Sequence, residues 1–440
     1  MNKKNNSVVV FWFRRDLRLE DNAGLYNALQ SGYPVLPLFI FDSEILSQIE
    51  NKYDRRVDFI HQILMHILTQ LKKHGSSMCV KFGKPTDIFN QLTKDYDVKS
   101  VYTNRDYETY ALERDKEISL LLKAKNIEFL TFKDQVIFEY NEVLKSNDEP
   151  YTVFTPYSKT WKQKLSESNY KNYQSENELK NFIQDDNKVV PTLGEIGFEK
   201  TDLVFRLPII NTELIKNYEN TRNTPSIEGS SKMSVHLRFG TISIRKLVSY
   251  ALKNSEIWLN ELIWREFFMT ILVQFPYVEN APFKKQYDFI QWRNNEKEFT
   301  DWCEGKTGYP IVDAGMRQLN ETGWMHNRVR MIVAGFLTKH LLIDWRWGEA
   351  YFAQKLIDYD LSANNGNWQW AAGCGCDAAP YFRIFNPAEQ TKKFDTDLLY
   401  IRRWVKDLDS TDYPQPIVEH TFARNRALEV YQRGLMDSRF

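Results

Sequence analysis

The chain has 440 residues, 42% of them hydrophobic and 26% charged, with 58 basic and 58 acidic side chains. This length exceeds what one hydrophobic core usually supports, so we expect two domains of an ordinary globular protein rather than a fibrous or disordered chain. The zero net charge excludes a globally basic nucleic-acid-binding protein, so any DNA site must be a local basic patch.

The cysteines and the apolar runs indicate the cellular compartment in which the protein is expected. The chain contains four cysteines, Cys79, Cys303, Cys374 and Cys376. They are too few and too scattered for a disulfide framework, and no second pair accompanies Cys374 and Cys376 to complete a metal site. Residues 1–7 are polar, and no run of about 18 apolar residues occurs. We therefore expect a soluble cytoplasmic protein without a bound metal.

Residues 1–134 alternate short apolar runs of β type with helical patterns. The runs span 8–13, 35–41, 78–82, 100–103 and 127–132. Between the second and third runs, Phe59, Ile63, Ile67 and Leu71 recur at helical spacing, which indicates an amphipathic helix. The alternation predicts an α/β domain with a doubly wound, Rossmann-like parallel sheet. No glycine-rich dinucleotide motif follows its first strand.

The remaining chain has a different character. Residues 135–200 are polar, with Pro150, Pro156 and Pro191 interrupting any long helix, so we interpret them as an interdomain linker. From 201 to 440 the pattern is helical and β-type alternation essentially vanishes. This part is predicted to be an all-helical domain, and the aromatic residues concentrate after residue 250.

An apolar helical stretch after residue 256 carries polar side chains on one face. Glu261, Trp264, Arg265 and Phe268 stand at i, i+3, i+4 and i+7, so they share that face. The residues alone leave two interpretations open. One is a core helix with an internal ion pair between Glu261 and Arg265, and the other is a pocket wall that hydrogen-bonds, stacks and neutralises a phosphate.

The segment 324–331 repeats this mixture. Asn327, Arg330 and Met331 fall at i, i+3 and i+4, so we expect them on one face, with Arg328 and Arg330 on different sides. His326 has no other residue of metal-ligand type at metal spacing, so we expect it to cap or flank the helix.

Two polar stretches suit a large ligand. Residues 358–370 hold two acids, three asparagines and two tryptophans, and burying Asp358 or Asp360 without a partner would cost on the order of several kcal/mol. A polar pocket satisfies them. The stretch 229–234 offers three serines, a glycine and a lysine, enough to hold a phosphate, although a helix cap is the commoner use of such serines.

Several long motifs resemble those of the photolyase/cryptochrome family, in detail the class I cyclobutane pyrimidine dimer photolyases. They are 11–22 (FWFRRDLRLEDN), 258–268, 307–313 (TGYPIVD), 323–330 and 358–386. The resemblance spans nearly the whole chain. It implies an α/β antenna domain and a helical domain that binds FAD. It further implies blue-light-driven repair of DNA, in which excited reduced FAD passes an electron to a flipped-out dimer.

The resemblance also implies the residues that bind FAD. They are Tyr218, Ser230, Ser231, Lys232, Met233, Ser234, Trp258, Glu261, Arg265, Arg330, Asp358, Tyr359, Asp360 and Asn364. Among them, Arg330 should pair with Asp358, and Asn364 should face the flavin N5. The family loop often reads Thr-Ser-x-Leu-Ser-Pro. This chain has Ser230, Met233 and Val235 there, changes that keep the hydroxyls.

The same resemblance assigns catalysis, lesion binding and electron transfer. Catalysis falls to Glu261, Asn327, Met331 and Asn364. Contacts to the lesion or the DNA fall to Arg222, Glu261, Trp264, Arg265, Asn327, Arg328, Met331, Trp370, Arg383 and Gln390. An electron relay from the surface to the flavin falls to Trp292, Trp345 and Trp368, with Trp368 nearest the ring. Any one of these tryptophans taken alone would be interpreted as core packing.

Three other functions compete with dimer repair. A photosensory cryptochrome is disfavoured because no regulatory tail is evident before Phe440, and because Trp370 and Asn364 are repair-type residues. A (6-4) photoproduct photolyase would carry a histidine pair where this chain has Asn327 and Met331. A structural DNA-binding module would not require the tryptophan relay.

A second, antenna chromophore stays open. Folate-binding relatives hold the pterin with an Asn-Glu pair, but the aligned positions here are Tyr110 and Ala111. Folate is therefore disfavoured, and a deazaflavin, a second flavin or an empty pocket are alternatives. UV-damaged DNA is the expected partner, of a monomer without a protein partner.

Overall fold

The computed structural model describes residues 7–185 and 188–438 and divides the chain into two compact units. The first contains the described residues up to 139, together with 165–209 and 233–253. The second contains 140–164, 210–232 and the described residues from 254 onward. The segment predicted as a linker, 135–200, thus contributes residues to both units.

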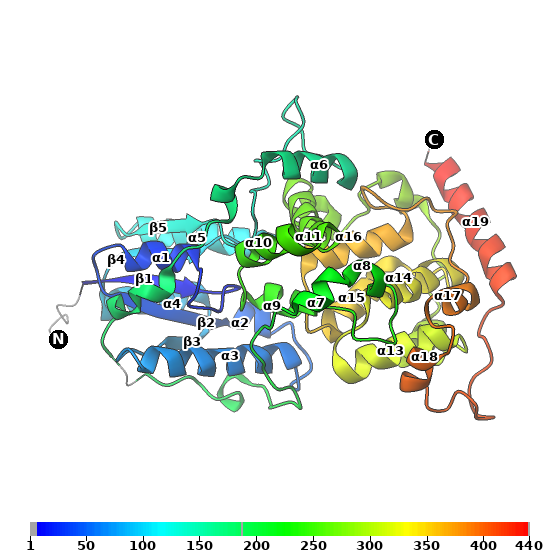
Figure 1. Ribbon diagram of the computed structural model, residues 1–440, viewed down its shortest axis with the longest axis horizontal. Helices are drawn as coiled ribbons and strands as arrows, with labels where there is room; N and C mark the ends of the chain where they lie inside the picture. Colours follow the sequence, from blue (N-terminus) through cyan, green and yellow to red (C-terminus); the bar gives the residue numbers. More distant parts are fainter. Residues whose placement is uncertain (1–6, 186–187, 439–440) are drawn as a thin grey trace. The chain divides into compact units, whose positions relative to one another are not determined.

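The first unit is built on a parallel sheet of five strands in the order β3-β2-β1-β4-β5 (Figure 1). The strands are β1 (Ser7–Phe13), β2 (Val35–Asp42), β3 (Cys79–Gly83), β4 (Asp97–Asn104) and β5 (Glu128–Phe132). All five strands and the parallel sheet predicted from the sequence are confirmed. β1 and β2 are apolar and buried on both faces, as the inner strands of a parallel sheet must be.

Helices cover both faces of this sheet. The helices of the first unit are α1 (Ala23–Leu29), α2 (Ser43–Leu46), α3 (Arg55–Lys72), α4 (Pro85–Asp95), α5 (Thr109–Lys123), α9 (Met233–Phe239) and α10 (Ile244–Asn254). Val8, Val10 and Trp12 of β1 pack in one cluster with residues of α4 and α5. On the opposite face, Phe11 approaches Gly24 of α1 so closely that a methyl group there would lie 2.9 Å from its ring. Short 3-10 turns occur at Glu167–Tyr170, Ser175–Asn181 and Gly194–Ile196.

The strand order reverses beside β1, where ligands bind in doubly wound sheets. At the carboxyl ends of β1 and β4, Arg14 forms an ion pair with Asp115, and Arg114 stacks 4.9 Å above the Trp12 ring. Tyr110 donates a 2.7 Å hydrogen bond from its hydroxyl to Asp42, and Ala111 beside it is buried. The side chains at this edge therefore already satisfy one another's charges.

A buried ion cluster joins distant segments of the first unit. Asp134, just after β5, accepts hydrogen bonds from Arg18 at 2.7 Å and from Arg245 of α10 at 2.8 Å. Arg245 also bonds Asp21 at 2.9 Å. Burial acts to raise the pKa of Asp134, but the two guanidinium groups outweigh it and hold that pKa at about 2. The cluster fixes α10 to the sheet.

The second unit is helical. Its α-helices are α6 (Phe154–Lys164), α7 (Thr212–Lys216), α8 (Tyr218–Thr221), α11 (Glu256–Gln274), α12 (Glu296–Glu304), α13 (Pro310–Thr322), α14 (Asn327–Gly335), α15 (Trp345–Lys355), α16 (Leu361–Ala372), α17 (Pro387–Phe394), α18 (Leu399–Trp404) and α19 (His420–Asp437). A π-helical turn, Phe336–His340, extends α14, and 3-10 turns lie at Pro276–Glu279 and Lys285–Phe289. An α/β domain with a helical remainder is the predicted fold class, which is confirmed.

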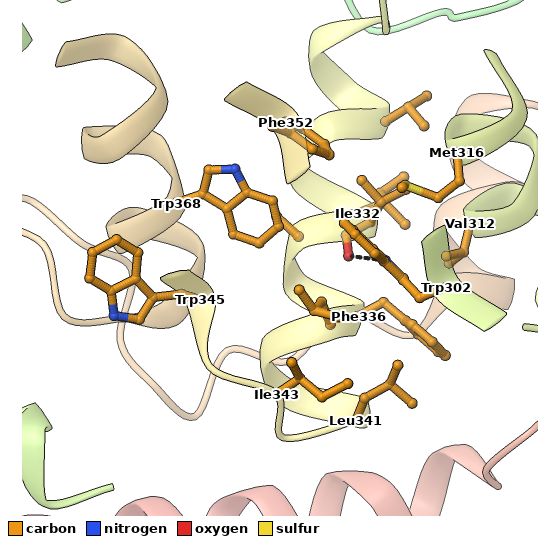
Figure 2. Close-up of a cluster of buried hydrophobic side chains, with 14 of the residues drawn as sticks. Trp302, Val312, Met316, Ile332, Phe336, Leu341, Ile343, Trp345, Phe352 and Trp368 are labelled. Carbon is orange, nitrogen blue, oxygen red and sulfur yellow. Dashed lines mark hydrogen bonds between the residues drawn. The ribbon is translucent and has the colours of Figure 1, made fainter. Parts of the chain in front are cut away.

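The core of the second unit lies among α12 to α16 and α19. Trp302, Phe336, Trp345, Phe352 and Trp368 belong to one buried cluster there (Figure 2). Among the described residues, no helix combines the length and the apolarity needed to cross a bilayer.

Candidate functional site

The second unit contains a cavity between α14, α15 and α16. Its lining residues are Asn327, Arg330, Met331, Ala334, Phe352, Leu356, Asp358, Tyr359, Asp360, Ala363, Asn364, Asn367, Trp368, Trp370 and Ala371. Eight of these were predicted as site residues from the sequence: Asn327, Arg330, Met331, Asp358, Tyr359, Asp360, Asn364 and Trp370. Trp368, predicted as the inner member of the electron relay, lines the cavity too.

An ion pair lies in the cavity wall. Arg330 forks onto both oxygens of Asp358, at 2.9 and 3.1 Å, and its Nε donates to the Met325 carbonyl at 2.8 Å. The Asp358 side chain is 3% exposed, so its charge depends on such donors. Arg330 pairs with Asp358 as the resemblance implies.

The start of α16 places amides beside these charges. Asp360 is the N-cap of the helix and accepts from the Ala363 backbone N–H at 3.1 Å. Asn364, one turn further, lines the cavity and donates to the Glu349 carbonyl at 3.2 Å. Asn365 points elsewhere and donates to the Val278 carbonyl at 2.9 Å. Of the three asparagines in the cluster, Asn364 and Asn367 line the cavity.

Helix α14 divides its polar residues as predicted. Asn327, Arg330 and Met331 all face the cavity. Arg328 instead reaches Asn223 at 2.6 Å and lies 4.5 Å from the centre of the Phe394 ring. His326 is the N-cap, and its Nδ1 accepts from the Arg328 N–H at 3.2 Å. Burial lowers the pKa of His326 to about 4, which keeps this acceptor neutral.

Glu261 of α11 contacts Arg222, which follows α8. Their side chains approach to 2.7 Å, and the Arg222 guanidinium also lies over the Tyr218 ring at 5.3 Å. Burial raises the pKa of Glu261, and Arg222 opposes that shift. The sequence predicted Tyr218, Arg222 and Glu261 for three different contacts, and the structure brings them together in one cluster.

The predicted phosphate loop runs from the second unit into the first. Ser230 and Ser231 precede Lys232, which has a left-handed backbone with φ of 53° and pairs with Glu228 at 2.9 Å. Lys232 also lies 5.1 Å above the Trp324 ring. Met233 and Ser234 begin α9 of the first unit, where Met233 is buried and Ser234 exposed.

The three tryptophans predicted as a relay occupy the core of the second unit. Trp368 and Trp345 are almost fully buried (Figure 2). Trp292 is partly buried against the same cluster. The ring of Trp292 meets the Tyr431 ring edge-on at 5.9 Å. Trp368 lines the cavity, Trp345 lies in the buried core, and Trp292 is partly exposed.

Trp264 and Trp370 line a second, smaller cavity with Phe268, Cys376 and Asp377. Trp370 lines both cavities, so it forms part of the partition between them. Arg383 is exposed and lines a third cavity together with Met331 and Trp370.

The remaining predicted residues lie at different depths. Trp258 is buried in α11, Arg265 is partly buried in the same helix, and Gln390 is partly buried in α17. None of these three lines the large cavity.

Two residues of interest were missed from the sequence. Phe154 stacks on Trp264 with ring centres 3.7 Å apart, although 110 positions separate the two residues in the chain. Glu349 of α15 holds a buried carboxyl oxygen that has no hydrogen-bond partner among the described residues. Burial raises the pKa of Glu349 to about 7, with a hydrogen bond from Asn365 opposing the shift. No local sequence pattern marks either residue.

Two family matches cover most of the chain. Residues 9–176 match the family described as DNA photolyase, and residues 258–412 match the FAD binding domain of DNA photolyase. The deoxyribodipyrimidine photo-lyase of a Synechococcus strain is 36% identical over 97% of this chain and 96% of its own length. That of Escherichia coli K12 is 36% identical over 96% and 98%. The chain therefore belongs to the DNA photolyase family.

Solved structures agree with this assignment. A class III photolyase from Agrobacterium tumefaciens superposes with a TM-score of 0.86 at 31% identity, covering 98% of both chains. A photolyase from Sulfolobus tokodaii, described as holding two FAD molecules, gives 0.80 at 35% identity over 97% and 99%. A Synechocystis cryptochrome gives 0.82 at 25% identity over 98% and 100%. Photolyases and cryptochromes share this architecture.

Proposed function

We propose that this protein is a deoxyribodipyrimidine photolyase, which repairs cyclobutane pyrimidine dimers in DNA by light-driven electron transfer from bound, reduced FAD. The observation that carries the proposal is the polar cavity of the helical unit, in which Arg330, Asp358, Asn327 and Asn364 meet beside Trp368. The curated relatives that span the whole chain bear this enzyme name.

The cavity fits the FAD that the family implies. A flavin ring presents carbonyl acceptors and ring N–H donors along its edge, and the cavity offers guanidinium and amide donors with carboxylate acceptors. We assign Arg330, Asp358, Tyr359, Asp360 and Asn364 to hold the ring. Tyr218, Trp258, Arg265 and the loop Ser230–Ser234 are assigned to the rest of the cofactor. When bound and excited by blue or near-ultraviolet light, reduced FAD would supply the electron that cleaves the cyclobutane ring and would recover it afterward.

The lesion must leave the DNA stack to reach such a cavity. Extrusion of a nucleotide costs on the order of a few kcal/mol, less for a damaged base, and photolyases are a known example of base flipping. We assign Trp264 and Trp370 to compensate that cost by packing against the apolar face of the dimer. Asn327 and Met331, which face the cavity from α14, are assigned to contact the dimer directly.

Glu261 is assigned to bond the flipped thymine. Burial favours its neutral form, which can donate a hydrogen bond to a carbonyl oxygen that gains negative charge in the reduced dimer. Arg222 at 2.7 Å is positioned to stabilise the same charge. Arg222, Arg265, Arg328, Arg383 and Gln390 are assigned to border the DNA, where guanidinium groups can grip phosphates.

A cryptochrome-type photoreceptor is the second candidate, because a cryptochrome shares the fold at a TM-score of 0.82. The deciding experiment is to mix purified protein, carrying reduced FAD, with oligonucleotides that contain cyclobutane dimers, (6-4) photoproducts or no lesion. We expect loss of the cyclobutane dimers under blue light alone. Intact dimers despite bound, reduced FAD would contradict repair, and loss of (6-4) products would reassign the substrate.

An antenna chromophore, a monomeric state and a cytoplasmic location stay predictions. The second FAD named for the Sulfolobus relative makes a second flavin one candidate. Mass spectrometry of chromophores released from the purified protein distinguishes this flavin from a deazaflavin, a folate and an empty site.

A further inference from the structure

The indole of Trp264 is covered on one face by a side chain from a remote segment. The Phe154 ring lies parallel to it, with an interplanar angle of 6° and ring centres 3.7 Å apart. Trp264 also contacts Phe267 edge-on at 5.6 Å and Phe268 at 5.3 Å. Three rings therefore hold this indole, and Phe154 is the one that does not come from α11.

Phe154 also contacts a second residue that lines the smaller cavity. Its backbone N–H donates to Oδ2 of Asp377 at 3.0 Å. Asp377 and its neighbour Cys376 line that cavity, as do Trp264 and Phe268 of α11. Phe154 thus contacts two residues that line the cavity, Trp264 by a ring stack and Asp377 by a main-chain hydrogen bond.

The helix that begins with Phe154 is anchored to α11. Trp161 of α6 donates from its indole N–H to Glu266 at 2.5 Å, and the Tyr157 ring packs on Phe267 at 5.1 Å. Both α6 residues are almost fully buried. Because α6 is held at these two points, Phe154 at its start is held as well, although its own side chain is only partly buried.

We propose that Phe154 is a positioning residue for lesion recognition: its stack fixes the Trp264 indole, and its N–H fixes the Asp377 segment, so that the wall facing the flipped dimer is preformed. The inference rests on the proposed function, since it takes Trp264 as a lesion contact. A rigid indole loses less conformational entropy on binding, so Phe154 acts on affinity for damaged DNA. Phe154 does not line the cavity assigned to FAD, and the rings it contacts, Trp264 and Phe267, are not members of the relay.

If Phe154 served only to pack the fold, its removal would have a different effect on DNA binding. A stacked aromatic pair contributes beyond its buried area, and losing one that serves only folding would lower thermal stability without changing selectivity between damaged and undamaged DNA. A positioning role changes that selectivity. The ratio of the two dissociation constants therefore separates the two explanations.

The experiment compares FAD-loaded Phe154→Ala, Phe154→Tyr and Trp264→Ala with the unaltered protein. We expect Phe154→Ala to weaken binding of a dimer-containing oligonucleotide by about 2- to 10-fold, the range of an aromatic pair. Binding of the undamaged oligonucleotide and the repair yield per photon at saturating substrate should not change. Phe154→Tyr keeps the stack and should restore affinity. Phe132→Ala, which removes a partly buried phenyl stacked on Tyr102 in the first unit, is the matched control.

Each way in which the proposal could be wrong gives a different pattern of binding results. If Trp264→Ala weakens dimer binding but Phe154→Ala does not, the positioning role is wrong and the lesion contact stands. If neither variant weakens it, the lesion role of Trp264 and the inference fall together. An equal loss for damaged and undamaged DNA, or a loss that Phe154→Tyr does not restore, also overturns the inference. Absorbance at the flavin bands and the melting temperature verify that each variant is folded and loaded.

Discussion

Asp134 in the α/β unit and Glu349 in the helical unit are both buried carboxyl groups, yet their pKa values shift in opposite directions. Asp134 lies between Arg18 and Arg245, which hold its pKa at about 2 against the effect of burial. Glu349 has one oxygen without a partner among the described residues, and burial raises its pKa to about 7. The first unit uses its charges to hold segments together. In the second unit, burial opposes the ionisation of Glu349, whose backbone carbonyl accepts a hydrogen bond from the cavity residue Asn364.

One buried carboxyl group of the first unit has a raised pKa instead of a lowered one. Asp16, in the motif that follows β1, has a pKa raised by burial to about 6. It accepts hydrogen bonds from the Arg14 backbone at 2.6 Å and from Asn104 at 2.6 Å, so even this carboxyl is fully engaged in structure. What distinguishes the helical unit is therefore polar groups that line open space, not unusual pKa values alone.

The largest effect is expected from a substitution that breaks the ion cluster of the α/β unit. Asp134→Ala leaves Arg18 and Arg245 buried without their shared carboxylate, which should cost about 3 to 5 kcal/mol of unfolding free energy. Because the folded pKa lies below the unfolded value of 3.8, this contribution is present above about pH 4 and is lost as the pH falls toward 2. Urea unfolding at pH 7 and pH 3 measures both. Asp202→Ala, in an exposed pair with Arg55, should change little.

The next largest effect is expected from a substitution in the wall of the cavity assigned to FAD. Arg330→Ala removes the fork on Asp358, so we expect FAD to bind about 100-fold more weakly, equivalent to about 3 kcal/mol. Fluorescence titration of released flavin measures the change. Arg402→Ala, which breaks an exposed pair with Asp409 in the same unit, is the control. Unchanged FAD content in Arg330→Ala would place the flavin elsewhere.

Glu349→Gln should make the helical unit more stable at alkaline pH. The folded pKa of about 7 exceeds the unfolded value of 4.5, so Glu349 contributes its stability below about pH 4.5 and loses it as the pH rises through 7. The amide stays neutral, so we expect a gain of about 2 kcal/mol at pH 8 and none at pH 4.5. Melting temperatures across this range test it, with Glu113→Gln on the exposed face of α5 as control. An equal gain at both pH values would contradict the ionisation argument.

Glu261→Ala should lower the repair yield per absorbed photon several-fold while changing dimer binding less, because the lost hydrogen bond matters most once the lesion carries the extra charge. Flash photolysis with prebound substrate measures the yield. Glu261→Gln retains a donor and should recover part of it. A yield that is the same in all three proteins would remove Glu261 from catalysis.

Trp292→Phe should have the smallest effect on repair. It interrupts the outer end of the relay, so photoreduction of oxidised FAD should slow markedly, whereas repair by chemically reduced enzyme should equal that of the unaltered protein. Absorbance under illumination follows the first and dimer loss follows the second. Impaired repair in the reduced variant would contradict a relay that only restores reduced FAD.

Periodic patterns in the sequence predicted most of the fold and part of the site. The five strands, α3 and the face shared by Asn327, Arg330 and Met331 were readable because period 2 and period 3.6 are properties of consecutive residues. Periodicity could not decide whether Glu261 pairs with Arg265. The partner seen at 2.7 Å, Arg222, comes from another helix.

The sequence by itself determined the α/β and helical halves, the polar cluster at 358–370 and the family, because these depend on local periodicity, composition and contiguous motifs. Tertiary structure alone decided that Phe154 stacks on Trp264, that Arg18 and Arg245 share Asp134, and that Glu349 lacks a partner for one oxygen. Those contacts join residues about 100 or more positions apart, or depend on which neighbours exclude water. Burial and dielectric environment are properties of the packed chain, and no single segment encodes them.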